Sequence, residues 1–259
     1  MANSLQQQEQ VNTYFQSQAT LWKDIYTSNS LLSEIVRDRH AAILGWIDSL
    51  ALAPGSQVLE VGCGAGFMAV ALAQRGLRVQ AIDSVENMVE QANRYAVETG
   101  TANLLSITVG DAHTLAFDDD SFDLVLAIGV IPWLAQPELA MREVARVTKP
   151  GGYAILATAN RMALPSLLDP LYNPFLAPLR QRVKHMLERI GPRRPSDQSL
   201  SMTYHNCRFI DDYLARLALV KTRGMTRGFQ FWFLRREVLP DPPGIALHRR
   251  LQRLADRHI

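Results

Sequence analysis

The chain of 259 residues has few cysteines and no long apolar run. Its two cysteines, Cys63 and Cys207, lie far apart, and neither has a Cys or His partner at zinc-ligand spacing, so we expect no disulfide framework and no structural metal. No apolar stretch reaches the roughly 18 residues needed to cross a bilayer. The first residues, MANSLQQQEQ, lack the basic start and apolar segment of a secretory signal. These absences predict a globular protein with a cytoplasmic location.

Neither sign of charge dominates the chain, which has a net charge of +2, but the two signs are separated along it. Residues 1–159 contain 9 Lys and Arg against 17 Asp and Glu, whereas residues 160–259 contain 18 against 8. Such a separation fits attraction between two parts of one molecule. It also fits a surface for an anionic substrate or a lipid headgroup, and the sequence leaves both interpretations open.

The middle of the chain alternates short apolar runs with helical patterns, which predicts an α/β fold with a parallel sheet covered by helices on both faces. A tight turn at 149–152 precedes the fifth run. The predicted strands are 57–61, 77–83, 104–109, 122–128 and 153–159, and the predicted helices between them are 67–75, 85–98 and 137–147.

Helical patterns flank this α/β core. Residues 11–50 predict helices with a shared apolar face, and the Gln-rich first ten residues are expected to be frayed. Residues 160–204 contain six prolines yet are apolar, which is typical of a lid or a binding insertion. Further predicted elements are a basic amphipathic helix at 179–190, a helix at 206–217, an antiparallel pair of strands at 219–226 and 229–234, and a basic helix at 244–257.

A glycine cluster follows the first predicted strand and opens the first helix of the core. The segment reads Glu60-Val-Gly62-Cys-Gly64-Ala-Gly66. Glycines allow a tight turn and the close approach of a ligand, and the helix N-terminus offers free N–H groups. Asp83 ends the next strand, where a carboxylate can accept hydrogen bonds from two ribose hydroxyls. Together these features predict a nucleoside-binding βαβ unit.

The spacing of the glycines indicates which nucleoside is bound. They occur at offsets 0, 2 and 4, whereas the dinucleotide fingerprint has them at offsets 0, 2 and 5. The carboxylate of Glu60 would repel a pyrophosphate but would favour a cationic or zwitterionic ligand. The loop therefore favours S-adenosylmethionine over NAD.

The successive motifs of the core resemble those of class I S-adenosylmethionine-dependent methyltransferases. They are residues 57–66, Asp83, Gly110-Asp111-Ala112, 122–128 and 149–152, and the resemblance covers roughly residues 55–160. It implies a Rossmann-like, doubly wound, mostly parallel sheet of seven strands. On this basis the chain divides into a helical cap (1–52), a cofactor-binding α/β core (53–159), a helical lid and substrate insertion (160–204), and a C-terminal part of the core with a basic terminal helix (205–259).

The resemblance also implies roles for individual residues. Gly62, Gly64 and Gly66 would let the loop wrap the methionine part of the cofactor, S-adenosylmethionine. Glu60 would orient that loop or reach the cofactor's amino group through water, and Asp83 would hold the ribose diol. The other implied cofactor residues are Ser84 and Met88 beside the adenine, Asp111 and Ala112 at its amino group, and Ile128 and Gly129 beneath the sulfonium. Each acidic residue has a simpler alternative. Glu60 can be a loop carboxylate, Asp111 a turn residue, and Asp83 a cap for the helix at 85–98, although Ser84 is expected to fill that capping role.

The loop after residues 122–128 indicates the class of acceptor. It is apolar and lacks the Asn-Pro-Pro-Tyr or Asp-Pro-Pro-Tyr motif of methyltransferases that act on exocyclic amines or glutamine amides. We therefore expect a hydrophobic small molecule of quinone, polyketide, terpenoid or lipid type, with O-methylation favoured. No aromatic and basic motif for nucleic acid occurs. The basic helices at 179–190 and 246–257 can rest on a membrane surface or form a solvated face.

Candidate acceptor-binding residues are aromatic. Tyr14, Trp22 and Tyr26 resemble the cap of small-molecule methyltransferases, Trp133 follows the fourth strand, and Tyr204 follows the insertion. Each can instead pack in the core. His205 is the candidate catalytic base, because histidine accepts protons near neutral pH, and a surface or capping role is its alternative.

Two other functions stay open at the level of sequence. One is a partner subunit that binds S-adenosylmethionine without transferring its methyl group, and the other is an NAD-dependent oxidoreductase. The sequence does not determine the oligomeric state.

Overall fold

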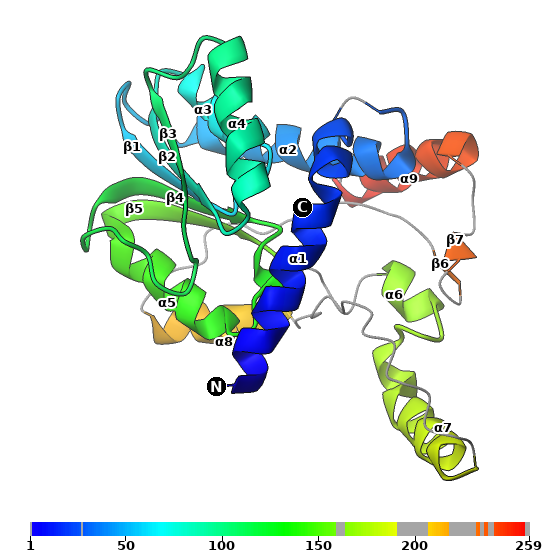
Figure 1. Ribbon diagram of the computed structural model, residues 1–259. Helices are drawn as coiled ribbons and strands as arrows, with labels where there is room; N and C mark the ends of the chain where they lie inside the picture. The colour runs from blue at the N-terminus through cyan, green and yellow to red at the C-terminus, as the bar shows by residue number, and fades with distance from the viewer. Residues whose placement is uncertain are drawn as a thin grey trace.

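A computed structural model describes residues 2–26, 28–158, 164–190, 207–217, 232–233, 236–237 and 241–256 (Figure 1). In chain order its elements are α1 (Ala2–Asp24), α2 (Leu31–Ser49), β1 (Gln57–Val61), α3 (Phe67–Ala73), β2 (Arg78–Asp83), α4 (Glu86–Glu98), β3 (Leu105–Val109), β4 (Phe122–Ile128), η1 (Ile131–Trp133), α5 (Pro137–Val147), β5 (Thr148–Ala157), α6 (Leu164–Leu168), η2 (Pro174–Leu176), α7 (Ala177–Ile190), α8 (Cys207–Arg216), β6 (Trp232–Phe233), β7 (Arg236–Glu237) and α9 (Asp241–Ala255).

Five strands form one parallel sheet in the order β3-β2-β1-β4-β5. The chain winds outward from β1 to β3 and then crosses back to β4, which pairs with the other side of β1. The direction of winding therefore reverses between β1 and β4. In open parallel sheets, ligands bind at the carboxyl ends of the strands on either side of such a reversal.

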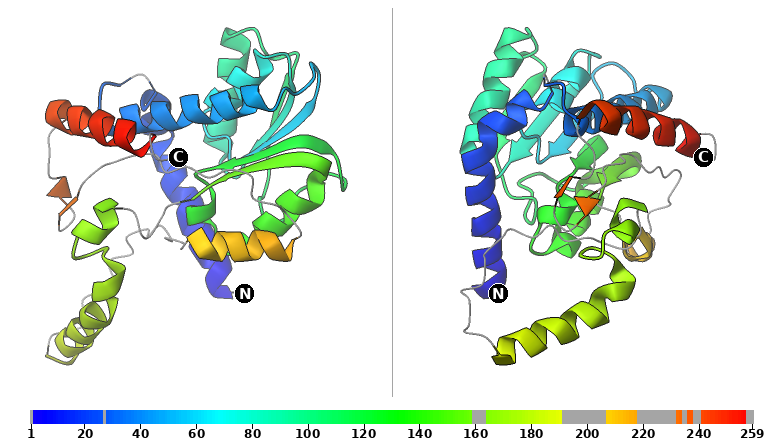
Figure 2. Two further views of the ribbon diagram at one scale, coloured as in Figure 1. Left: turned by 180° about the vertical axis from the view of Figure 1, so that it is seen from behind. Right: turned by 90° about the vertical axis from the view of Figure 1, so that its right-hand side faces the viewer.

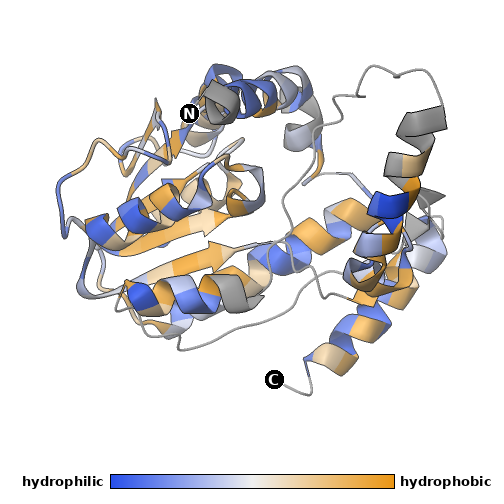
Figure 3. Ribbon diagram, turned by 90° about the horizontal axis from the view of Figure 1, so that it is seen from below, coloured by the Kyte–Doolittle hydropathy of each residue, from blue (hydrophilic) through white to orange (hydrophobic). Residues whose placement is uncertain are grey.

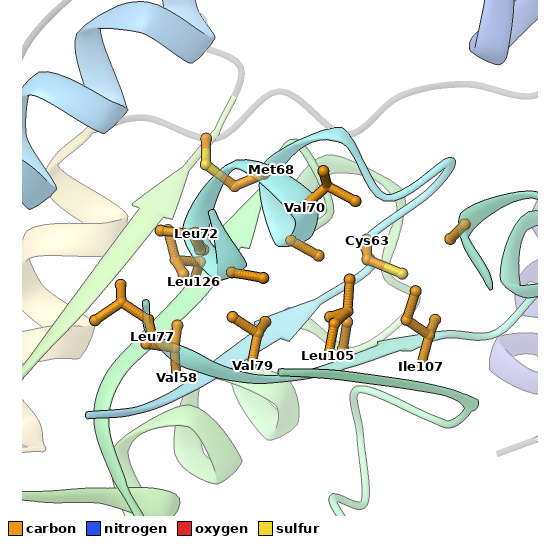
Figure 4. Packing of buried hydrophobic residues seen from close by; sticks show 14 of the residues in the cluster. Val58, Cys63, Met68, Val70, Leu72, Leu77, Val79, Leu105, Ile107 and Leu126 are labelled. Atoms are coloured by element: carbon orange, nitrogen blue, oxygen red, sulfur yellow. The ribbon is translucent and has the colours of Figure 1, made fainter. Parts of the chain in front are cut away.

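Helices cover both faces of the sheet because its strands are apolar on both sides. Val58, Leu124 and Leu126 pack toward α2, α3 and α4 (Figure 4), whereas Leu59 and Val125 pack toward α5 and α8. Figure 3 shows the hydrophobic strands between helices whose outer sides are largely hydrophilic. Strands buried on both faces give continuous apolar runs, which is why residues 122–128 could be assigned from sequence.

The predicted turn at 149–152 and the strand after it belong to one irregular strand, β5. Phe122 pairs with Thr148, but Leu124 pairs with Tyr153, so four residues of β5 lie opposite one residue of β4. Gly151 has a φ of +77° at this bulge. The turn is therefore an interruption within the strand pairing and does not precede it.

The helical cap begins earlier than predicted, because α1 starts at Ala2 and its Gln-rich end is not frayed. Gln8 Oε1 accepts a hydrogen bond from the Ala135 backbone amide at 3.2 Å, and Gln8 Nε2 donates to Asn12. These contacts explain the difference, since they hold a weakly apolar helix in place through polar side chains.

The C-terminal helix α9 packs against α2 (Figure 2). Asp241 accepts a hydrogen bond from the Leu31 backbone amide at 2.8 Å, and Arg249 pairs with Glu34 at 2.6 Å. His248 is fully buried, with Nε2 3.1 Å from a carboxylate oxygen of Asp38. The basic terminal helix is thus part of the folded body.

The predicted antiparallel pair of strands lies only partly within the described residues. Within the described residues, β6 pairs with β7, which lies after it in the chain, and the two form a sheet of their own. Residues 219–226, the predicted partner, lie outside the described residues. Pairing across two intervening residues closes a very short loop, which costs little chain entropy. No helix in the described part of the chain is both long and apolar enough to cross a membrane.

Candidate active site

The glycine turn between β1 and α3 is tightly enclosed on two sides. Gly62, Gly64 and Gly66 all have positive φ. A Cβ on Gly62 would lie 2.2 Å from the Val130 side chain, and one on Gly66 would lie 2.8 Å from Ala92 Cβ. A Cβ on Gly64 would meet nothing within 4 Å. The turn is therefore wedged between the β4 loop and α4, and it is open at its middle residue.

Glu60 carries an unsatisfied carboxyl group beneath this turn. The residue is 4% exposed, and its Oε2 has no hydrogen-bond partner. Burial, together with nearby Asp83, raises the pKa of Glu60 to about 8, although the Ala69 amide opposes this shift. The carboxyl group is therefore neutral at pH 7, and a cation placed beside it would favour the ionised form.

Asp83, the last residue of β2, joins the glycine turn to the start of α4. Its two oxygens accept hydrogen bonds from the Gly64 amide at 2.9 Å and the Val85 amide at 3.0 Å. Burial raises its pKa. Ser84, the sequence-based candidate for the cap of this helix, does not fill that role, because α4 begins at Glu86 and Ser84 Oγ donates to Asn12 of α1 at 3.0 Å.

Met88 lies in a small apolar cluster between α4 and α1. It is buried with Val85 and contacts the rings of Phe15 and Trp22. The indole Nε1 of Trp22 is buried and has no hydrogen-bond partner. The cluster forms an apolar surface next to the end of β2, and the indole N–H of Trp22 is a hydrogen-bond donor in it without a partner.

Asp111 and Ala112 occupy a short turn after β3. The carboxylate of Asp111 is exposed and accepts a hydrogen bond from the His113 backbone amide at 2.9 Å, with the imidazole Nδ1 2.7 Å away. Ala112 is buried. His113 therefore holds Asp111 in a local turn, while the other carboxylate oxygen is left for a further donor.

Arg39 of α2 reaches the loop after β4, where Ile128 ends the strand. Gly129 has a φ of +75°, and a Cβ there would lie 3.6 Å from a guanidinium nitrogen of Arg39. Burial lowers the pKa of Arg39, and the neighbouring Tyr26 hydroxyl opposes this shift. Among the described residues no carboxylate pairs with Arg39, so an anion can reach its guanidinium.

The sequence contained no signal for Arg39. Arg37 lies two residues earlier on the same helix, and it bonds to Glu34 and to the backbone carbonyls of Tyr26 and Ser28. The roles of Arg37 and Arg39 differ because of how α2 is placed against the sheet, which turns Arg37 toward backbone carbonyls and Arg39 toward the site.

His40 is a second residue that sequence reasoning missed. Its ring meets the Tyr26 ring edge-on at 5.6 Å, and its Nε2 is buried without a hydrogen-bond partner. Burial, with smaller effects from Arg39 and Arg75, lowers its pKa to about 4. The imidazole is therefore uncharged at neutral pH.

The predicted aromatic residues fall into two groups. Tyr14 stacks on Trp133 at 6.1 Å, and Phe15 meets both Trp133 and Trp22. Tyr26 instead stacks on Phe67 at the start of α3, with ring centroids 3.9 Å apart, and burial raises its pKa to about 12. Helix α1 thus spans from the end of β2 to the β4 loop (Figure 1).

Tyr204 and His205 lie outside the described residues. Within those that are described, no three His, Cys, Asp or Glu side chains come together as a metal site.

Comparison with known proteins identifies the family. A profile of the methyltransferase domain matches residues 59–156. The ubiquinone biosynthesis O-methyltransferase of Paracidovorax citrulli is 31% identical over 211 residues, which are 82% of this chain and 82% of that protein. The chain belongs to the class I S-adenosylmethionine-dependent methyltransferases. Its relative of the same name in Albidiferax ferrireducens is 31% identical over 182 residues, covering 70% of this methyltransferase and 68% of that protein.

Solved structures show the same fold. The magnesium protoporphyrin IX methyltransferase of Synechocystis PCC 6803, solved with bound S-adenosylhomocysteine, superimposes with a TM-score of 0.64 at 21% identity, over 87% of this chain and 95% of that one. The fold class predicted from sequence, a Rossmann-like α/β methyltransferase, is confirmed, with five strands of its parallel sheet described.

The cofactor of this methyltransferase is S-adenosylmethionine, as predicted. The residues of the site fit that molecule. Its amino-acid end carries an ammonium and a carboxylate. Among the described residues, the site offers a carboxyl on Glu60 with one unsatisfied oxygen and a guanidinium on Arg39 that pairs with no carboxylate. The fit to S-adenosylmethionine sets aside the NAD-dependent alternative, and the methyltransferase domain and O-methyltransferase relatives set aside the non-catalytic one.

Proposed function

We propose that this methyltransferase transfers a methyl group to an oxygen atom of a hydrophobic small molecule of quinone, polyketide, terpenoid or lipid type. Two observations support this acceptor class. The relatives described above are named ubiquinone biosynthesis O-methyltransferases. The loop after β4 is apolar, and α1 covers its Trp133 with aromatic rings.

One observation carries the assignment of the cofactor site: among the described residues, a carboxyl group and a guanidinium group that lack a partner of opposite charge lie at the two loops that flank the reversal of the sheet. Glu60 lies beneath the β1 turn, and Arg39 lies against Gly129 after β4. A buried guanidinium without a counter-charge is costly, and a cation beside Glu60 would favour the ionised form of its carboxyl group, so each group suits a ligand group of opposite charge. We assign the ammonium of the methionine end to Glu60 and its carboxylate to Arg39.

We assign the remaining cofactor contacts from this position of the methionine end between Glu60 and Arg39. Asp83 would hold the ribose hydroxyls, since a carboxylate has about four acceptor sites and the backbone amides of Gly64, Val85 and Ser84 do not fill all of them. Met88, Ser84, Asp111 and Ala112 would surround the adenine. The other proposed contacts are the turn glycines Gly62, Gly64 and Gly66 along the methionine chain, and Ile128 and Gly129 beneath the sulfonium.

The acceptor would lie beside Trp133, with Tyr14 and Trp22 closing the site from α1 and Tyr26 at its far end. When the acceptor oxygen forms its bond to the methyl carbon, its proton must pass to a base. His40 is neutral but a weak base, so His205, beside Tyr204, remains the proposed proton acceptor.

Three further features belong to this proposal. Residues 160–204 would close over the acceptor, and strands from the residues beyond 217 would complete a seven-stranded sheet. A cytoplasmic location is supported by the free, buried thiol of Cys63.

Calorimetry with two ligands tests the cofactor assignment. S-adenosylhomocysteine carries the amino-acid end, whereas 5′-methylthioadenosine lacks it. Arg39→Gln should weaken binding of the first about tenfold or more, the range for a lost charged hydrogen bond, and leave the second unchanged. Arg94→Gln, which removes an exposed charge from α4, is the matched control. Equal losses for both ligands would show that Arg39 only supports the fold.

Transfer of a labelled methyl group tests the acceptor class. The panel should contain hydroxylated quinones with prenyl tails, polyketide phenols, terpenoid alcohols and fatty acids, with a nucleobase and a glutamine peptide as negative controls. We expect label on the oxygen of one hydrophobic class. Label only on the nucleobase or the peptide would refute the proposed acceptor while leaving the cofactor assignment intact.

A further inference from the structure

Two side-chain amides of α1 connect the loop after η1 to the end of β2. Gln8 Oε1 accepts a hydrogen bond from the Ala135 backbone amide at 3.2 Å. Gln8 Nε2 donates to Asn12 Oδ1 at 3.3 Å, and Ser84 Oγ donates to the same oxygen at 3.0 Å. We name Gln8, Asn12 and these two partners the α1 amide relay. Its far end lies one residue after Asp83, the last residue of β2.

The backbone amide at the start of the relay fixes the orientation of both side-chain amides. A backbone N–H group donates and cannot accept, so the Gln8 atom that faces Ala135 is its oxygen. The NH2 group of Gln8 then faces Asn12 and requires an oxygen there. The positions of oxygen and nitrogen in Asn12 are therefore assigned by the hydrogen-bond network. The NH2 group of Asn12 is the group that the relay leaves unused.

This NH2 group is a donor that is held in place beside the cofactor site. Asn12 is half-buried, and no acceptor among the described residues bonds to its Nδ2. Helix α1 packs against α4, with Val11 buried and Phe15 against Val85 and Met88, so the helix cannot turn Asn12 away. A donor that other bonds already hold in place loses little freedom when it binds a ligand.

A ribose at the end of β2 needs a donor as well as an acceptor. In the proposed function Asp83 accepts the hydrogens of the ribose hydroxyls, and a carboxylate has no hydrogen to give in return. Each hydroxyl oxygen keeps lone pairs that can accept a hydrogen bond. The hydroxyl of Ser84 uses its one hydrogen on Asn12, so it does not supply this donor. The NH2 group of Asn12 does.

We propose that Asn12 is a cofactor-binding residue whose Nδ2 donates a hydrogen bond to a ribose hydroxyl oxygen of S-adenosylmethionine, and that Gln8 is the positioning residue that orients its amide. The inference rests on the ribose contact that the proposed function gives to Asp83. The ribose is then held by an acceptor from β2 and a donor from α1. Helix α1 belongs to the cofactor site as well as to the acceptor site.

Calorimetry with S-adenosylhomocysteine and its 2′,3′-dideoxy analogue tests the role of Asn12. The ratio of the two dissociation constants measures what the ribose hydroxyls contribute to binding. Asn12→Asp keeps an oxygen for Gln8 and Ser84 but has no NH2 group, so the ratio should fall about fivefold, the effect of one lost neutral hydrogen bond. The added negative charge acts on both ligands alike and cancels in the ratio.

Gln8→Glu tests the orientation of Asn12 without a change at Asn12 itself. The new carboxylate still accepts from the Ala135 amide but offers an oxygen to Asn12, whose NH2 group should turn toward it and away from the ribose. The ratio should again fall about fivefold, whereas a purely structural role of Gln8 would weaken both ligands equally. Since the ratio compares two ligands on one variant, a partial loss of folded protein does not alter it.

Ser17→Ala is the matched control on the same helix. Ser17 is exposed and donates to the Tyr14 carbonyl within α1 at 2.7 Å, so its loss should leave the ratio at the wild-type value. A ratio that falls as far in Ser17→Ala as in Asn12→Asp would overturn the proposal, because any change in α1 would then produce the effect.

The same measurement separates failure of this proposal from failure of the proposed function. If Asp83→Ala lowers the ratio but Asn12→Asp leaves it unchanged, Asn12 only attaches α1, and the role of Asn12 is disproved while the ribose contact of Asp83 stands. A ratio that falls in Asn12→Asp but not in Gln8→Glu would overturn the role of Gln8. If Asp83→Ala leaves the ratio unchanged, the ribose contact itself is misplaced, and the role of Asn12 fails with it.

Discussion

Replacement of Glu60 by glutamine should stabilise the protein without its cofactor while weakening the binding of the cofactor. The carboxyl is 4% exposed and one oxygen has no partner. Its pKa is about 8 in the fold, against an ordinary value of 4.5. Between these two values the folded state holds a proton that the unfolded state has released. The contribution of Glu60 to stability therefore falls as the pH rises through this window, by about 1.4 kcal/mol per pH unit.

At pH 7 this loss of stability amounts to about 3 kcal/mol. Glutamine does not incur the loss, because its side chain resembles the neutral acid. We expect Glu60→Gln to raise the free energy of unfolding by about 2–3 kcal/mol at pH 7, with the gain disappearing near pH 4. In the presence of S-adenosylhomocysteine this gain should shrink, because a bound ligand stabilises the folded state by an amount that grows with the logarithm of its affinity. The variant lacks the charge that pairs with the ligand's ammonium.

Urea unfolding between pH 4 and pH 9, with and without ligand, measures both effects. Glu143→Gln is the matched control, because Arg146 donates hydrogen bonds to Glu143 and lowers its pKa. That variant should lose stability at pH 7, and the loss should shrink as the pH falls. The reasoning about Glu60 is refuted if Glu60→Gln destabilises the ligand-free protein at pH 7, or if ligand affinity is unchanged.

Three further substitutions test other parts of the structure. Asp83→Ala should reduce affinity for S-adenosylhomocysteine by about 1–3 kcal/mol in calorimetry, because polar partners lose their acceptor; unchanged affinity would mean that the ribose site lies elsewhere. Gly66→Ala should unfold at lower urea than Gly76→Ala, since both glycines have positive φ but only the first would place a Cβ 2.8 Å from Ala92. His248→Ala should cost about 2 kcal/mol of stability, because it empties a buried site between α9 and α2; an unchanged unfolding midpoint would show that α9 is dispensable.

The α/β core could be derived from the sequence because its signals are local. Residues 57–61, 122–128 and 137–147 were assigned with the bounds that the structure shows. Strands buried on both faces need uninterrupted apolar residues, and the helices between them need one apolar stripe. The glycine turn was equally clear, since a Cβ at Gly62 or Gly66 would collide with a neighbouring side chain.

The regions outside the core were derived less well because their structure depends on partners distant in sequence. Polar contacts of Gln8 extend α1 over residues that were expected to be frayed. Ser84 was expected to cap α4, but Asn12 draws its hydroxyl away. The strand at Trp232–Phe233 pairs with the segment after it, a pairing that the sequence did not indicate.

By itself the sequence determined the order of the strands along the chain, the enclosed glycine turn and the two acidic residues beside that turn. Each depends on which residue type occupies a position, and the sequence gives the residue types directly. Only the tertiary structure decided that Arg39, and not Arg37, faces Gly129, and that the apolar residues of α6 and α7 point outward. These outcomes depend on how a helix is rotated against its neighbours, and packing between distant segments sets that rotation.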